Sequence, residues 1–178
     1  MKRVIDVFEY TGEILKAVKG GVLLTTMADG RVNTMTISWG TLGIEWGKPI
    51  FTTFIREHRF TKQLLDKNPE FTVNIPYGTF DKDILKVCGT KSGRDTDKVK
   101  DLGLTLENAD SISGKAIREL PLTLECKVVY VQKQEESAMH EAYQKACYPK
   151  DVDGTFFGAN RDYHTAYYGE FVRAYILE

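Results

Sequence analysis

Short runs of β-prone residues, separated by turns and brief helical stretches, recur along the whole chain, and this feature most constrains its fold. The runs are rich in Val, Ile, Thr and aromatic residues and are bounded by Gly, Pro, Asn or Asp. They lie at residues 22–27, 32–40, 49–55, 70–76, 104–107, 115–119, 122–134 and 169–178. A sheet of six or more strands exposes two edges unless it closes on itself. The pattern therefore predicts a mainly β (α+β) fold, a small closed barrel with short peripheral helices.

Turn and helix signals connect these strands. Asp29-Gly30 between two β-prone runs predicts a hairpin. Ile14, Leu15 and Val18 fit one face of a short helix, which Gly20-Gly21 ends. Further helices are predicted at residues 61–67, 81–89 and 137–147 and just before Gly103.

The bulk composition excludes several classes of function. With 178 residues, we expect a single domain over residues 1–178. The formal net charge of -1 and the absence of a dense Lys/Arg cluster predict no nucleic-acid partner. No apolar run approaches the roughly 20 residues of a membrane helix, so no membrane partner is expected. Three widely spaced cysteines argue against a disulfide scaffold or a zinc site, and a reducing cytoplasm is the expected location.

Two arginines and a threonine stand where the predicted helix at 61–67 begins. A helix N-terminus offers unpaired N–H groups and a partial positive charge, and arginine adds a planar fork of donors. Arg56, Arg59 and Thr61 therefore predict an anion site. The alternative is a solvated arginine pair with Thr61 as an ordinary N-cap.

The run at 32–40 carries small hydroxyl side chains on one face. Thr34, Thr36 and Ser38 alternate with larger residues, and Trp39 follows them directly. A planar polar heterocycle could lie on such a face, with Trp39 covering it. The alternatives are a partly exposed strand, since threonine favours β structure, and a tryptophan in the core.

Residues 88–98 and His164 are the remaining candidates. Ser92-Gly93 ahead of a helix with Lys98 could hold an anion, although the order of residues does not match a Walker A loop. Cys88 is either a reactive thiol or simply packed. His164 could hydrogen-bond a substrate or donate a proton, or it could be structural. No His, Cys, Asp or Glu group has metal-site spacing, and no hydrolase nucleophile elbow is present.

Four blocks of sequence together carry a resemblance to a known family. They read "NTMTISWGTLGIEWGKPIFTTFIREHRFT", "FTVNIP", "CGTKSGRDTDK" and "HTAYYGEFV", in this order. The chain resembles the flavin reductase-like family of FMN-binding split barrels, most closely its flavoredoxin-type branch, from about Val22 to the last strand.

The resemblance implies a homodimeric split β-barrel with FMN near the subunit interface. It implies that Thr34, Thr36, Ser38 and Trp39 line the flavin ring, that Arg56, Arg59 and Thr61 hold the phosphate, and that His164 faces the reactive edge of the ring. It also implies that residues 88–98 close around the cofactor, with Ser92 and Lys98 among the contacts. The other cofactor-binding residues that it implies are Asn33, Met35, Phe60, Cys88 and Gly89.

The function implied is that of an FMN-binding oxidoreductase, either a flavin reductase or a flavoredoxin-like electron carrier. Its electron donor is NAD(P)H or a redox protein. The chain has no Gly-x-Gly-x-x-Gly fingerprint for a dinucleotide, so the sequence leaves the donor open. The alternatives are a flavin- or haem-binding module without turnover and an enzyme like pyridoxamine-phosphate oxidase.

Overall fold

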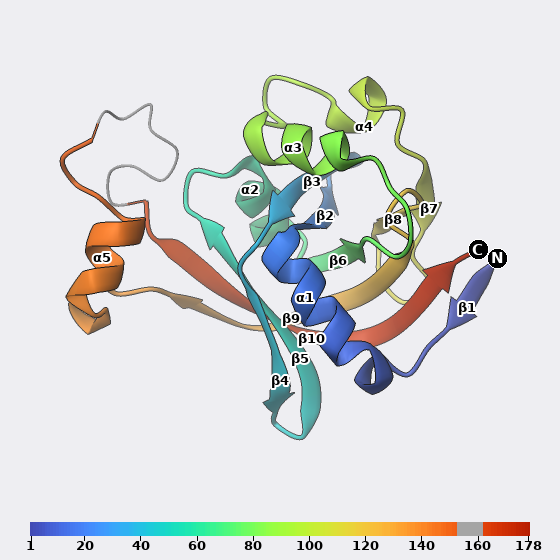
Figure 1. The fold of residues 1–178 in the computed structure, drawn as a ribbon, viewed down its shortest axis with the longest axis horizontal. Coiled ribbons are helices and arrows are strands. Elements are labelled where there is room, and N and C mark those ends of the chain that lie inside the picture. The colour runs from blue at the N-terminus through green and yellow to red at the C-terminus, as the bar shows by residue number, and fades with distance from the viewer. Residues whose placement is uncertain (153–161) are drawn as a thin grey trace.

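The computed structural model describes residues 1–152 and 162–178, and most of the strands form one antiparallel sheet (Figure 1). Neighbouring strands follow the order β3-β2-β6-β9-β10-β5-β4, and β1 pairs with β10. The strands are β1 Lys2–Val4, β2 Val22–Ala28, β3 Arg31–Ile37, β4 Gly40–Glu45, β5 Lys48–Arg56, β6 Glu70–Ile75, β9 Leu122–Lys133 and β10 His164–Leu177. A separate pair is formed by β7 Leu106–Asn108 and β8 Lys115–Ile117.

The barrel is split rather than closed. Within the described part of the chain, the ladder is an open path from β3 to β4, and these two end strands do not pair. The mainly β fold class with a split barrel is confirmed, while the prediction of full closure is wrong. A buried core of aliphatic and aromatic side chains fills the sheet, and it includes Leu24, Phe51, Phe71, Leu124 and Tyr167.

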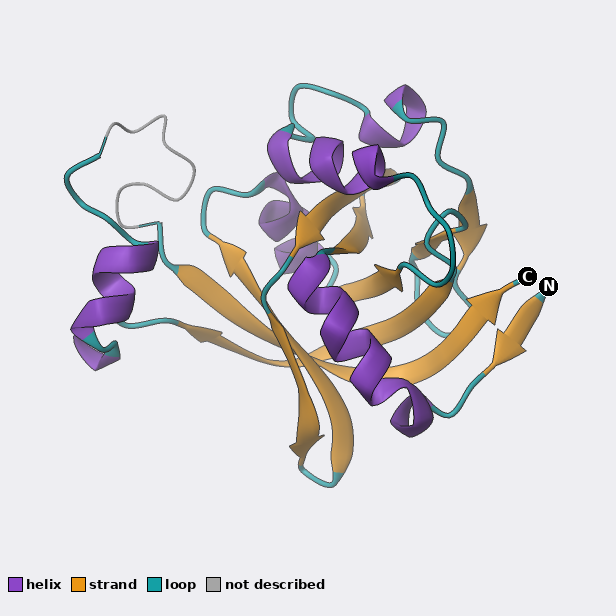
Figure 2. Cartoon of the chain, viewed as in Figure 1, coloured by secondary structure: helices purple, strands orange, loops and turns teal. Residues whose placement is uncertain are grey.

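Short helices lie around the sheet, as the purple ribbons of Figure 2 show. They are η1 Val7–Tyr10, α1 Thr11–Gly20, α2 Phe60–Lys67, α3 Lys82–Thr90, α4 Lys98–Asp101, η2 Glu136–Ala138 and α5 Glu141–Cys147. Figure 1 shows α3 and α4 together above β3, and α5 at the far end of β9 and β10. No helix of the described residues is long and apolar enough to cross a membrane.

Several boundaries differ from the sequence prediction. Strand β3 ends at Ile37, earlier than the predicted run at 32–40, and a further strand, β4, forms a hairpin with β5 through Trp46-Gly47, where both residues have positive φ. Such a turn has the same backbone as the predicted one at Asp29-Gly30, which the structure confirms. Leu15 is 53% exposed, so of the three residues predicted to face the core from α1, only Ile14 and Val18 do so.

The observed end of one helix and the start of one strand also differ from the prediction. Helix α3 continues through Gly89 to Thr90 instead of closing at the glycine. His164, expected before the closing strand, is the first residue of β10. Its place in the β-ladder matters for the site, because the ladder fixes which residue lies opposite it.

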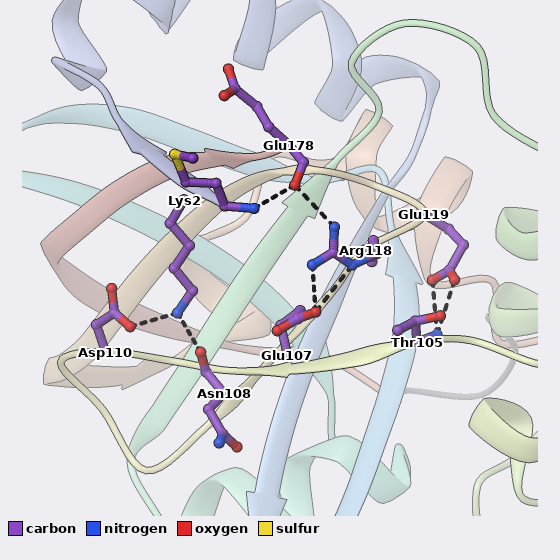
Figure 3. Close-up of polar contacts among 9 residues, drawn as sticks. Lys2, Thr105, Glu107, Asn108, Asp110, Arg118, Glu119 and Glu178 are labelled. Atoms are coloured by element: carbon purple, nitrogen blue, oxygen red, sulfur yellow. Dashed lines mark hydrogen bonds and ion pairs between the residues drawn. The ribbon is translucent and has the colours of Figure 1, made fainter.

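The two chain ends lie side by side at one end of the sheet (Figure 1). Figure 3 shows how side chains join them to β7 and β8: Lys2 Nζ pairs with Asp110 at 2.6 Å, and Arg118 Nη1 donates to the carbonyl of Glu178 at 3.2 Å. These contacts are exposed, and exposed ion pairs contribute little to stability. They attach the small β7–β8 pair to the termini at the end of the sheet opposite α5 (Figure 1).

Candidate functional site

A hollow of about 150 Å³ lies where β3 ends, β5 ends and β10 begins. Seven of the residues singled out in the sequence come together there, and two others, Ile37 and Phe54, join them. The seven are Met35, Thr36, Ser38, Trp39, Arg56, Arg59 and His164. Arg56 and His164 are adjacent because they are paired residues of the β5–β10 ladder. The sequence alone does not reveal this register, because the register depends on which strands pair.

Arg56 is buried and is anchored to the main chain. Its Nη1 donates to the carbonyl of Asp162 at 2.9 Å and its Nη2 to the carbonyl of Cys147 at 3.0 Å. Its guanidinium also lies over the ring of Tyr148, 5.0 Å from the centroid. Burial lowers the pKa of Arg56 from its ordinary value. These bonds join the end of α5 to Asp162, shortly before β10, and leave a positive charge at the wall of the hollow.

Arg59 and Lys98 extend this positive region. Arg59 is the N-cap of α2, and no side chain caps that helix. Burial lowers its pKa, and so does the charge of Arg56. Lys98 is only 4% exposed, and its Nζ donates to the carbonyl of Lys91 at 3.3 Å. Across residues 1–152 and 162–178, no carboxylate forms an ion pair with Lys98.

The pKa of Lys98 is lowered by burial and by Arg59, against the opposing effect of the Cys88 thiol. A buried cation such as Lys98, repelled by a neighbouring positive charge, is costly unless an anion compensates it. The donor set of Arg59, Lys98 and the uncapped N-terminus of α2 therefore fits an anionic group.

A second hollow, of about 660 Å³, lies between the β2–β3 turn and α4. Three more of the sequence candidates line it, namely Asn33, Thr34 and Lys98. Gly93 also lines it, and the glycine is required at that place, because an added Cβ would lie 2.0 Å from Asn33 Oδ1. The candidates of β3 are thus divided between two hollows.

The remaining candidates line neither of these hollows. Thr61 is the second residue of α2 and not its N-cap, and its hydroxyl accepts a hydrogen bond from Asn33 Nδ2 at 2.7 Å. Phe60 lies under the guanidinium of Arg31, 4.4 Å from the ring centroid. Ser92 Oγ accepts from the backbone N–H of Arg94 at 3.2 Å, within the loop before α4. An added Cβ at Gly89 would meet Thr36 Cβ at 3.4 Å.

The hydroxyls of β3 are used within the protein. Thr34 Oγ1 accepts from Thr25 Oγ1 at 3.0 Å, and Thr36 Oγ1 donates to the carbonyl of Leu85 at 2.6 Å. Ser38 and Trp39 are exposed, with Trp39 at 41%. The part of this segment that is open to a ligand is therefore its end, beside the hollow.

Cys88 is buried in α3, where it packs with Leu23 and Ile84. Burial raises the pKa of its thiol to about 11, despite the charge of Lys98. A thiol with such a pKa is not a nucleophile at neutral pH. The geometry favours the packed alternative for Cys88.

His164 lies beside Trp39, with ring centroids 4.7 Å apart and planes tilted by 33°. Burial and the charges of Arg56, Arg59 and His58 lower the pKa of its imidazole from 6.5 to about 3. His164 is therefore neutral at pH 7 and can hydrogen-bond a ligand, but it has no imidazolium proton to donate. Its Nδ1 lies 2.6 Å from the hydroxyl of Tyr148, a residue that the sequence patterns did not indicate.

The other two histidines lie outside the hollow. His58 Nδ1 contacts the carboxylate of Asp162, and its side chain is exposed. His140 caps α5, accepting from the backbone N–H of Ala142 at Nδ1 over 3.2 Å. Among the described residues, no group of three or more His, Cys, Asp or Glu side chains could hold a metal ion.

Comparisons with known proteins identify the family of the chain. The family model described as "Flavin reductase like domain" matches residues 16–176. An uncharacterized protein of Archaeoglobus fulgidus is 31% identical over 111 residues, 62% of this chain and 60% of that protein. The chain thus spans less than two thirds of the length of this curated relative.

Two solved structures share the fold. One is an FMN-binding domain of a flavin reductases-like enzyme from Shewanella baltica, with a TM-score of 0.65 and 13% identity, covering 99% of this chain and 77% of that chain. The other is flavoredoxin from Methanosarcina acetivorans, with a TM-score of 0.64 and 23% identity, covering 89% of this chain and 68% of that chain. At such identities the likeness shows the split-barrel fold.

Proposed function

The chain belongs to the flavin reductase like domain family, and from this premise we propose that it is an FMN-binding oxidoreductase. We expect it to act as a flavin reductase or as a flavoredoxin-like electron carrier, with NAD(P)H or a redox protein as the donor. The observation that carries the proposal is the positive region formed by the buried Lys98 and the half-buried Arg59, beside the start of α2, where no side chain caps the helix. It adjoins a hollow that also contains an exposed tryptophan and a neutral histidine.

The phosphate of FMN suits the positive region. A phosphate monoester carries a charge of about -1.5 to -2 near neutral pH. Arg59 and Lys98 would hold it together with the N–H groups of α2, and Arg56, which is already bound to two carbonyls, would add to the field. A phosphate beside the buried Lys98 would offset the cost of burying its charge, so binding should be favourable.

The ring would occupy the hollow at the end of β3. Trp39 offers an aromatic face, Met35 and Phe54 offer apolar walls, and His164 offers a hydrogen bond. Bound FMN would supply the redox chemistry that no side chain here provides. The chain's own part is to anchor one end of the cofactor, exclude water from one face of the ring and set the charge around it.

A spectrum of the purified protein tests this proposal. We expect flavin absorption bands, or their appearance on adding FMN, and bleaching under NADH or NADPH in the absence of oxygen. Bleaching by dithionite but by neither nucleotide favours the electron carrier over the reductase. A protein that neither carries nor takes up FMN contradicts the proposal.

The second part of the proposal is a homodimer. Several large apolar side chains are exposed on β4, the β4–β5 turn and the outer half of β9: Ile44, Trp46, Val129, Tyr130 and Val131. Trp46 and Tyr130 contact each other across these elements, with ring centroids 6.1 Å apart. An exposed aromatic pair of this kind, with exposed aliphatic residues near it in the sequence, is typical of a protein–protein interface. Its occupant, on this proposal, is a second copy of the chain.

The cytoplasm remains the expected location. The three cysteines are all free thiols, which suits a reducing compartment.

A further inference from the structure

A chain of hydrogen bonds leads from the main chain to the imidazole of His164. The backbone N–H of His164 donates to Gln134 Oε1 at 3.3 Å, and the hydroxyl of Tyr148 donates to the same oxygen at 2.7 Å. The Tyr148 hydroxyl also lies 2.6 Å from His164 Nδ1. Gln134 follows the end of β9, Tyr148 follows α5, and His164 begins β10, so three separate segments meet here.

The direction of each proton follows from the first donor. A backbone N–H can only donate, so the group of Gln134 that faces it must be the carbonyl oxygen and not the amide nitrogen. The same oxygen faces the Tyr148 hydroxyl and takes its one proton. The tyrosine oxygen can then only accept from His164, which requires a proton on Nδ1.

The other ring nitrogen is therefore unprotonated. Within the described residues, no group forms a hydrogen bond with Nε2 of His164, and the residue lines the hollow at the end of β3. The charged and titratable groups around it are Arg56, Arg59 and His58, which all disfavour a second proton, together with Tyr148. Nε2 thus carries a lone pair in a positively charged surrounding.

We propose that Tyr148, held by Gln134, is a positioning residue that fixes His164 as the Nδ1–H tautomer, so that Nε2 accepts a hydrogen bond from the ligand in the hollow. This inference rests on the proposed function for the identity of the ligand. Oxidised FMN offers two kinds of donor, the imide N–H of its ring and the hydroxyls of its ribityl chain. Neither belongs to the phosphate, so this contact is separate from the one with Arg59 and Lys98.

The tautomer can be measured without any flavin. With ¹⁵N-labelled histidine, long-range proton–nitrogen NMR distinguishes a protonated ring nitrogen from an unprotonated one. The signal of His164 is the one missing from His164→Asn, and the chain has only three histidines. We expect a protonated Nδ1 and an unprotonated Nε2 in the wild-type protein. A protonated Nε2 in the wild type overturns the proposal.

Variants of the two supporting residues provide the second arm. Tyr148→Phe removes the acceptor and Gln134→Leu releases the tyrosine hydroxyl, so both should shift His164 toward the Nε2–H tautomer. Gln134→Glu keeps an acceptor oxygen and should preserve the wild-type tautomer. Tyr143→Phe, which removes an exposed hydroxyl from α5, is the matched control and should change nothing. An unchanged tautomer in both Tyr148→Phe and Gln134→Leu overturns the proposal.

Flavin affinity then tests the contact itself. A lost neutral hydrogen bond costs about 0.5–1.5 kcal/mol, so Tyr148→Phe should weaken both FMN and riboflavin about three- to tenfold. Lumiflavin lacks the ribityl chain. If Tyr148→Phe loses as much affinity for lumiflavin as for FMN, the donor to His164 Nε2 is the ring N–H. If it loses no affinity for lumiflavin, the donor is a ribityl hydroxyl. Unchanged affinity for all three ligands overturns the contact. Failure of the wild type to bind any flavin would instead contradict the proposed function and leave the NMR result standing.

Discussion

Lys98 places a positive charge in an almost fully buried position without a carboxylate partner among the described residues. We expect Lys98→Met, which keeps most of the apolar stem, to weaken FMN binding about tenfold to a hundredfold, as the loss of one charge-assisted hydrogen bond does. Riboflavin, which lacks the phosphate, should lose far less. Calorimetric titration of both ligands measures the difference.

Lys100 provides the control, because it lies on the same helix and is exposed. Lys100→Met should leave both affinities close to those of the wild type. Equal losses for FMN and riboflavin in Lys98→Met would contradict a contact between Lys98 and the phosphate.

His164 makes the stability of the fold depend on pH. Its pKa is about 3 in the folded protein, below the ordinary 6.5, so between these values the unfolded chain binds more protons. Stability is therefore lost as the pH falls below about 6.5, by at most about 1.4 kcal/mol per pH unit from this residue. Urea unfolding of His164→Asn between pH 4 and pH 7 should show a correspondingly smaller loss. The control is His140→Asn, an exposed helix cap replaced by another good cap.

An identical pH dependence in wild type and His164→Asn would show that this imidazole is not held neutral. Carboxylates titrate in the same range, so the comparison between the two proteins is the relevant quantity, and not either curve alone.

For single residues, the sequence indicated which side chains reach the site more reliably than it indicated their hydrogen-bond partners. The arginines at the start of α2 and His164 do reach one hollow. The hydroxyls of Thr34 and Thr36 form hydrogen bonds within the protein instead, with β2 and with α3 respectively. Tyr148 and Gln134 carried no local signal, since their role depends on segments that meet only in the folded chain.

Among the secondary-structure elements, β10 shows the tightest packing constraint. Gly169 follows a register shift in the pairing with β9, and an added Cβ would lie 2.5 Å from Phe71 Cζ and 2.9 Å from Cys126 Cβ. We expect Gly169→Ala to lower the free energy of unfolding by about 1–3 kcal/mol, the usual cost of overpacking. Chemical denaturation monitored by fluorescence measures this change.

Gly43 on β4 is the matched strand glycine, because nothing lies within 4 Å of an added Cβ there. Gly43→Ala should stay within about 0.5 kcal/mol of the wild type. A Gly169→Ala variant as stable as Gly43→Ala would mean that the β9–β10 pair is not packed as described.

The elements themselves were predicted well where a local signal exists. The Asp29-Gly30 hairpin, the Asn68-Pro69 end of α2 and the Gly103 stop after α4 all follow from turn chemistry. Strand β4 was missed because its hairpin turn uses Trp46 at positive φ, and tryptophan is not a turn signal. The split in the barrel depends on long-range pairing, which no local pattern reveals.

At the scale of the whole molecule, Trp46 occupies a turn of unfavourable backbone conformation and also lies in the proposed dimer interface. It is 60% exposed and has a φ of 51°, which is unfavourable for a bulky residue. Asn tolerates this backbone, so Trp46→Asn should leave the monomer as stable as the wild type or slightly more stable. In a dimer that buries this face, the same change should weaken association by tenfold or more, on the order of an aromatic hot spot.

Sedimentation equilibrium measures this association. Tyr143→Asn, which removes an equally prominent aromatic from α5 at a different end of the molecule, should leave it unchanged (Figure 1). Equal dimer affinity in wild type and Trp46→Asn would place the interface elsewhere.

The central claim is that Arg59, at the start of α2, and Lys98, buried at the start of α4, bind the phosphate of a flavin. Its most direct test is a titration of flavin-free protein with FMN and with riboflavin under the same conditions. Two charge-assisted contacts predict that FMN binds about a hundredfold tighter or more, with the difference falling as salt is raised. Equal affinity for the two flavins, or binding of neither, would contradict the claim.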